Sequence, residues 1–118
     1  MIHAEYHEAT MVHQWLEVRG IPHTHITNEQ PNRKRAVAEK RMGKSAGFPD
    51  FLIFLPSGVN VAVELKRADK GAKATPAQRK WLYLLSTRGF ECAVCHGAQE
   101  VVEFLKQLGY TDGDNTVF

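Results

Sequence analysis

The stretch GFPDFLIFLPSGVNVAVELK, residues 47–66, decides the fold of this chain. It contains two apolar runs, 51–55 and 59–63, on either side of a Pro-Ser-Gly sequence. Apolar runs of this length around a short turn are typical of a β-hairpin. We therefore expect two adjacent antiparallel strands, with Asp50 before the first and Glu64 near the end of the second.

This hairpin predicts a cluster of charged groups. Antiparallel pairing places Asp50 and Glu64 at the same end of strands about 4.8 Å apart. Alternation along the second strand puts Glu64 and Lys66 on one face and Leu65 on the other. Carboxylates, together with the Leu65 backbone carbonyl, are the hard oxygen ligands that Mg²⁺ or Mn²⁺ prefers. Beside such an ion, Lys66 can orient a water or stabilise charge on a phosphate.

The first helix supplies another carboxylate. Apolar residues at three- and four-residue spacing predict a helix from about residue 3 to 19, ended by Gly20-Ile21-Pro22. Glu8 shares the apolar face with Met11 and Val12. A buried carboxylate needs a partner, because an unpaired buried charge is costly. Glu8 is therefore a candidate third acid of the metal site, and a salt bridge to an Arg or Lys is the alternative.

The rest of the chain alternates between helices and strands. The patterns predict a strand at 22–27, a turn at 28–31, a basic helix at 33–42, a helix from Thr75-Pro76 to about 88, a strand at 90–95 and a helix at 99–108. The last two strands flank a helix and should be parallel. We expect one α/β domain over 1–118, with a loose tail from about residue 110. Its sheet should be mixed and four-stranded, with helices on its faces. The core order is helix-strand-strand-strand-helix-strand-helix.

Charge is unevenly distributed along the chain. Segment 31–44 has six basic residues and one acid, a net +5, so the remainder of this chain of net charge +2 carries −3. A basic segment on a mildly acidic body favours a polyanionic partner, and a solvated face is the alternative. Its basic residues are Arg33, Lys34, Arg35, Lys40, Arg41 and Lys44.

Composition excludes several other classes of protein. No apolar run approaches the roughly 20 residues of a membrane span, and the N-terminus lacks the order of a signal peptide. We therefore expect an intracellular, cytoplasmic protein with neither a membrane nor an organic cofactor as partner. Cys92 and Cys95 lie three apart on a predicted strand and face opposite sides, which predicts packing thiols rather than a redox or zinc pair.

The motifs together resemble a known family. Gly47-Phe48-Pro49-Asp50 followed by Glu64-Leu65-Lys66 is similar to the PD-(D/E)XK nuclease superfamily. Within it, TPAQRKWL at 75–82 resembles the Q-x-x-W helix of the VRR-NUC domain, the virus-type replication–repair nuclease. The first helix and the basic segment also fit, so the resemblance runs from about residue 3 to 106. Glu-x-Lys alone is a weak motif, but the combination is specific.

This resemblance implies a metal-dependent DNA endonuclease. By position, Asp50, Glu64 and the Leu65 carbonyl would bind the metal, and Lys66 would be the catalytic lysine. Glu8 would bind the metal directly or through water. Gln78 would support the lysine or the water, with a solvent-facing glutamine as its alternative.

The resemblance also bears on the partner and the assembly. The chain resembles family members that consist of this domain alone, which are typically viral. This resemblance implies a homodimer that cuts branched DNA such as four-way (Holliday) junctions. Alternatives are a restriction-like, DNA-end- or flap-processing nuclease and a non-catalytic DNA-binding accessory protein. Three further cations follow the Glu-x-Lys strand and are candidate phosphate contacts: Arg67, Lys70 and Lys73.

Overall fold

The computed structural model describes residues 4–26, 33–69 and 71–114. The elements are α1 (Ala4–Val18), β1 (His23–His25), α2 (Arg33–Arg41), β2 (Phe51–Phe54), β3 (Asn60–Lys66), α3 (Pro76–Ser86), β4 (Phe90–His96), α4 (Ala98–Gln107) and a 3₁₀ turn (Asp112–Asp114). This confirms the predicted α/β class and core order, with the basic helix α2 between β1 and β2. The predicted turn at 28–31 lies outside the described residues.

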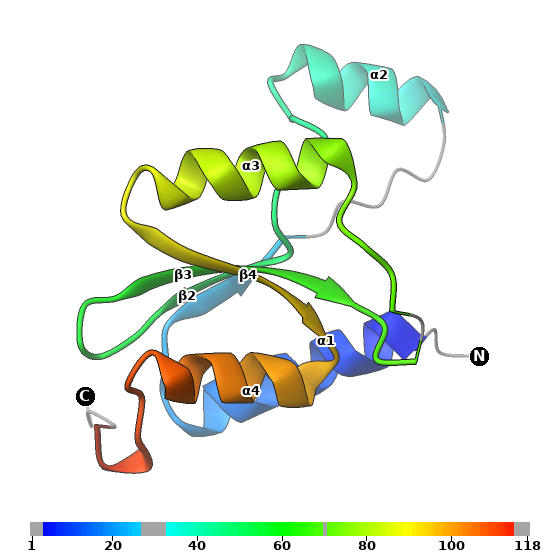
Figure 1. Ribbon diagram of the computed structural model, residues 1–118. Coiled ribbons are helices and arrows are strands. Elements are labelled where there is room, and N and C mark those ends of the chain that lie inside the picture. The colour runs from blue at the N-terminus through cyan, green and yellow to red at the C-terminus, as the bar shows by residue number, and fades with distance from the viewer. Residues whose placement is uncertain (1–3, 27–32, 70, 115–118) are drawn as a thin grey trace.

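The four strands form one mixed sheet in the order β1-β2-β3-β4. The β1–β2 and β2–β3 pairs are antiparallel, and β3 runs parallel to β4, as the crossover through α3 predicts. Helices α1 and α4 cover one face of the sheet and α3 covers the other (Figure 1). Phe51 pairs with Val63, so the next residues outward, Asp50 and Glu64, lie at the same end of the hairpin.

The core fills the space between the sheet and the α1–α4 layer. Phe51 and Val63 are cross-strand partners, and both are fully buried. Val12 and Leu16, one turn apart on α1, belong to the same core cluster. Burying each such side chain stabilises the fold by about 1.5–3 kcal/mol. Because alternate residues of β3 point to opposite faces, this packing directs Glu64 and Lys66 toward the α3 side.

The segment after α4 differs from its prediction. A loose tail from about residue 110 is wrong for its first part, because Tyr110 is buried with its ring edge-on to the Trp15 ring, at a centroid distance of 5.7 Å. Arg19 donates from Nε to Asp112 at 2.9 Å and lies 4.0 Å over the Trp15 ring. Residues 115–118 lie outside the described residues. Within the described ranges, no helix is both long enough and apolar enough to cross a bilayer.

Candidate active site

The carboxyl end of β3 carries the centre of the site. Glu64 is a charged residue buried to 3% exposure, while Leu65 is buried on the opposite face. The ammonium nitrogen of Lys66 lies 3.8 Å from Glu64 Oε2. The expected alternation is confirmed, and a buried carboxylate here is held beside a cation, as its desolvation requires.

Asp50 joins this group from the loop that enters β2. Its Oδ2 accepts the backbone N–H of Leu65 at 2.7 Å. A residue in a strand presents its N–H and its C=O to the same side, so the Leu65 carbonyl faces the side of the strand on which Asp50 lies. The structure thus brings Asp50, Glu64 and the Leu65 carbonyl, predicted together from the hairpin, to one end of the β2–β3 pair.

The loop before Asp50 is held against α3 by a glycine. Gly47 has φ +85°, and a Cβ there would lie 2.6 Å from the backbone carbonyl carbon of Ala77. Only glycine allows both this conformation and this approach. The next residue, Phe48, packs edge-on against Trp81, with ring centroids 5.0 Å apart. Half-buried Trp81 therefore packs against Phe48 and is not an exposed platform for a base.

Gln78 links the start of α3 to the buried end of β3. Its Oε1 accepts the Lys66 ammonium at 2.9 Å, and its Nε2 donates to Glu64 Oε2 at 3.0 Å. The same Oε1 accepts the Thr75 N–H at 2.8 Å, while the Thr75 hydroxyl accepts the Gln78 N–H at 3.2 Å. This is a capping box, which the Thr-x-x-Gln spacing signals in the sequence. The solvent-facing alternative for Gln78 is wrong.

Glu8 approaches from the other side of the sheet, on α1. It accepts the backbone N–H of Ala98 through Oε2, at the start of α4, where an anion is favoured by the helix dipole. Gly97 donates its N–H to the Lys66 carbonyl at 2.9 Å, so Glu8 lies close to the end of β3. Across the described ranges the partner of Glu8 is this backbone N–H, not the side-chain cation of the alternative. Its role as a metal ligand stays a prediction.

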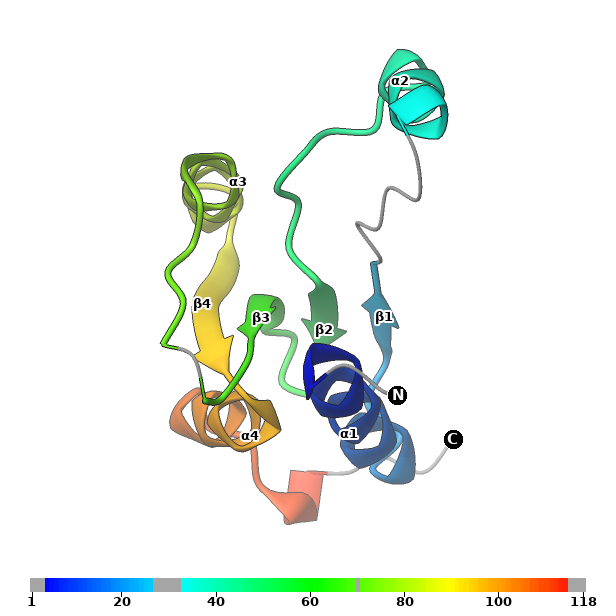
Figure 2. The same ribbon diagram turned by 90° about the vertical axis from the view of Figure 1, so that its right-hand side faces the viewer.

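The basic segment forms a helix that stands apart from the sheet (Figure 2). α2 has no buried residue. Glu39 binds Lys44 at 3.0 Å and Arg35 at 3.4 Å, and the hydrogen bond from Lys44 is the main cause of a lowered pKa of Glu39. The other four cations of this segment are exposed: Arg33, Lys34, Lys40 and Arg41.

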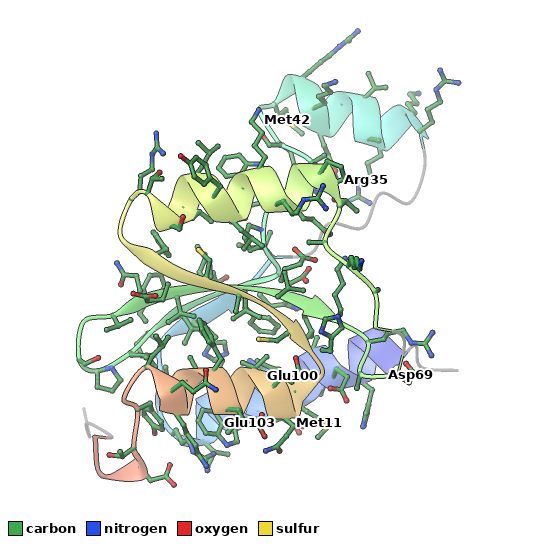
Figure 3. All side chains as sticks on the ribbon, viewed as in Figure 1. Met11, Arg35, Met42, Asp69, Glu100 and Glu103 are labelled. Carbon is green, nitrogen blue, oxygen red and sulfur yellow. The ribbon has the colours of Figure 1, made fainter. Side chains whose placement is uncertain are left out.

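Arg67 and Lys73, two of the three cations after β3 that we predicted as phosphate contacts, lie on a different part of the molecule from those of α2. Arg67 donates twice to Asp69, at 3.1 and 2.9 Å. Asp69 lies on the α1 side of the sheet, away from α2 (Figure 3). Lys73 is exposed, and Lys70 lies outside the described residues. Of these three, Arg67 is already engaged in an ion pair.

The two cysteines are packing residues, as predicted. Both are free thiols, and Cys95 is 2% exposed. Burial raises the pKa of Cys92 and raises that of Cys95 to about 12. Redox exchange and zinc ligation need the thiolate, which burial disfavours here.

A mixed sheet with this carboxylate–lysine end defines an α/β fold of nuclease type. The sequence profile of the VRR-NUC domain matches residues 4–99, and the chain belongs to this family. It is similar to a solved "VRR_NUC domain protein", with a TM-score of 0.66, 25% identity and 99% of each chain covered. A solved "VRR_NUC domain" shares the fold at a TM-score of 0.67 and 23% identity, over 92% of this chain and all of that one. Comparison with curated proteins finds no match.

Proposed function

We propose that this protein is a Mg²⁺- or Mn²⁺-dependent endonuclease that hydrolyses phosphodiester bonds of branched DNA such as four-way junctions. The observation that carries the proposal is the end of β3, where buried Glu64 is bridged to Lys66 by Gln78 and Asp50 is hydrogen-bonded to the next strand residue. Family membership supports a nuclease with DNA as its partner.

The donor set of the site fits a hard cation. Asp50 and Glu64 lie at the same end of the hairpin and offer carboxylate oxygens, and the Leu65 carbonyl faces the side on which Asp50 lies. Two carboxylates with a carbonyl suit Mg²⁺ or Mn²⁺, which keep waters and substrate phosphate in their other positions. Glu8 is the further candidate, directly or through water. When bound, such an ion neutralises phosphate charge and makes a bound water more acidic.

Lys66 and Gln78 have different roles: Lys66 donates hydrogen bonds to the reacting groups, and Gln78 positions Lys66. The Gln78 carbonyl oxygen, 2.9 Å from the ammonium, and Glu64, 3.8 Å away, hold Lys66 in place. From there the ammonium donates to the attacking water or to a phosphate oxygen and stabilises negative charge that grows during attack. Gln78 is a positioning residue, since its polar atoms are engaged by Lys66, Glu64 and the Thr75 N–H.

The deciding experiment is cleavage of a labelled panel comprising a four-way junction, a flap, a splayed arm, a duplex and a single strand. We expect cutting with Mg²⁺ or Mn²⁺, none in EDTA, and the highest rate on the junction. Equal activity in EDTA would contradict the metal dependence. Equal rates on duplex and junction would instead favour a restriction-like nuclease, and binding without any cutting would favour an accessory protein.

Symmetric cleavage of a junction needs two active sites, which we propose a two-fold homodimer supplies. Analytical ultracentrifugation tests this, with and without junction DNA. A protein that stays strictly monomeric in both conditions would contradict the dimer.

Gln78 gives a prediction that separates capping from catalysis. Gln78→Leu removes three hydrogen bonds and should lower the free energy of unfolding by roughly 1–3 kcal/mol and the cleavage rate by on the order of 10²-fold. Thr75→Val is the matched control, because it removes the capping hydroxyl but keeps the Gln78 amide contacts. It should cost about 1 kcal/mol in stability with little loss of rate. Urea denaturation and single-turnover cleavage measure the two effects, and equal rates for both variants would contradict the positioning role.

The exposed cations of α2 give a prediction about DNA affinity. Arg33→Ala with Lys34→Ala should weaken junction binding and lower the slope of log K against log salt by roughly 1 for each phosphate that the variant no longer neutralises. Arg88→Ala with Lys106→Ala removes the same charge from α3–β4 and α4 and is the control. Anisotropy titrations in Ca²⁺ at several salt concentrations measure both. A salt slope unchanged from the original protein would mean that α2 presents only a solvated face.

A further inference from the structure

A group of side chains of the types that ligate metals lies where α1 turns back into the sheet. His13 and Glu17 are four residues apart and both exposed, so they lie one turn apart on the same side of α1. The helix ends as Ile21 donates its N–H to the Leu16 carbonyl at 3.0 Å, and Gly20 reverses the chain at φ +66°. This reversal returns His23, the first residue of β1, to the side of the helix that carries His13 and Glu17.

The three side chains converge closely. His13 Nδ1 lies 2.8 Å from His23 Nε2, and these two histidines and Glu17 each offer a ligand atom within 4.8 Å of the others. Ligand atoms bound to one tetrahedral Zn²⁺ at about 2.0–2.2 Å are roughly 3.3 Å apart. Small side-chain rotations therefore suffice to place all three around one ion.

His23 is already oriented as a ligand. Its Nδ1 lies 2.7 Å from the Ile21 carbonyl oxygen, which can only accept a hydrogen bond. Nδ1 must then carry the proton, so in the neutral ring Nε2 holds the lone pair and directs it toward His13. A backbone carbonyl on the second ring nitrogen is the contact that commonly fixes the tautomer of metal-binding histidines.

Arg19, which follows Glu17 at the end of α1, binds other groups. Arg19, two residues after Glu17, donates to Asp112 at 2.9 Å and to the Trp15 carbonyl at 3.2 Å. Its guanidinium lies over the Trp15 ring. The negative charge of Glu17, within 4.8 Å of the ligand atoms of both histidines, favours a cation between them.

We propose that His13, Glu17 and His23 bind Zn²⁺ or a related transition-metal ion, with a fourth position open to water. Two imidazoles and one carboxylate suit this borderline class of ion, whereas the oxygen ligands at the end of the β2–β3 hairpin suit Mg²⁺ or Mn²⁺. The ion joins the C-terminal turn of α1 to the edge strand β1, which stabilises the folded state. This site does not depend on the proposed nuclease function.

Titration calorimetry and thermal unfolding of the full chain with zinc chloride test the site. We expect a higher melting temperature and one Zn²⁺ ion per chain that remains bound when Asp50 and Glu64 are neutralised together, since the carboxylates of the hairpin can also take Zn²⁺. His13→Ala, His23→Ala and Glu17→Gln should each weaken binding at least about 10-fold to 100-fold. With Co²⁺ as probe, the visible spectrum of a tetrahedral ion should appear in the original protein and be lost in the variants.

Two controls keep the test specific. His7→Ala with His25→Ala removes two other exposed histidines and should leave Zn²⁺ affinity unchanged. Asp50→Asn with Glu64→Gln should also leave it unchanged. Folding of each variant is checked by circular dichroism. The proposal is overturned if His13→Ala with His23→Ala binds Zn²⁺ as tightly as the original protein, or if binding is lost in either control instead.

Discussion

Replacing Glu64 by glutamine is expected to lower the rate of DNA cleavage by on the order of 10³-fold or more with the fold intact. The charge of Glu64 is the most deeply buried in the site, at 3% exposure. Glutamine keeps the shape of the side chain and an oxygen that can accept a hydrogen bond from Gln78 Nε2. It removes the negative charge that we propose holds the metal. A bound metal ion supplies several kcal/mol of transition-state stabilisation, and each 1.36 kcal/mol changes a rate tenfold.

The measurement is single-turnover cleavage of a four-way junction at saturating protein. Asp69→Asn is the matched control, because it neutralises an acid on the loop after β3 that pairs with Arg67. This control should cleave at the rate of the original protein. Urea denaturation shows whether Glu64→Gln remains folded. A folded Glu64→Gln variant that retains activity within tenfold of the original would remove Glu64 from the catalytic mechanism.

The hairpin part of this site could be predicted because its determinants are local. A two-residue period fixes the face of Glu64 and Lys66, and a short turn fixes the register that brings Asp50 beside them. The Thr75-x-x-Gln78 capping box is equally local, but the contact of the Gln78 side chain with the active site is not. The two Gln78 contacts to Glu64 and Lys66 depend on how α3 packs on the sheet. The sequence alone therefore does not show whether the Gln78 side chain points to the site or to solvent.

Pairings between distant segments have no such local signal. The pattern predicts that Glu8 faces inward, but its partner is the first turn of α4, 90 residues away, which no periodicity reveals. The sequence does not predict the burial of Tyr110 for the same reason. Nor does it predict the ion pair of Arg19 with Asp112, which lie 93 residues apart. The His13–Glu17–His23 group depends on the turn after α1. Sequence spacing shows that His13 and Glu17 lie on one side of the helix. It does not show that a residue of the next strand, His23, lies beside them.

Replacing Lys66 by methionine is the second substitution with a large expected effect. Methionine keeps the length and apolar stem of the side chain, but the ammonium between Gln78 Oε1 and Glu64 Oε2 is lost. Removing one donor that stabilises growing negative charge costs about 2.7–4 kcal/mol, or 10²–10³-fold in rate. Junction affinity in Ca²⁺ should change much less, because the exposed cations of α2, which we propose bind DNA, remain. A loss of affinity as large as the loss of rate would assign Lys66 to substrate binding.

Chemical rescue distinguishes the lost ammonium from a disturbed fold. The thiol introduced by Lys66→Cys can be alkylated with 2-bromoethylamine, which restores an amine on a side chain of nearly the original length. The native thiols should react slowly, since burial raises the pKa of Cys92 and raises that of Cys95 to about 12. We expect alkylated Lys66→Cys to recover at least about 10-fold in rate, because the amine again supplies the donor for growing charge. Identical treatment of Lys66→Met should recover nothing. If the alkylated variant stays as slow as the untreated one while remaining folded, the ammonium is not the group that accelerates cleavage.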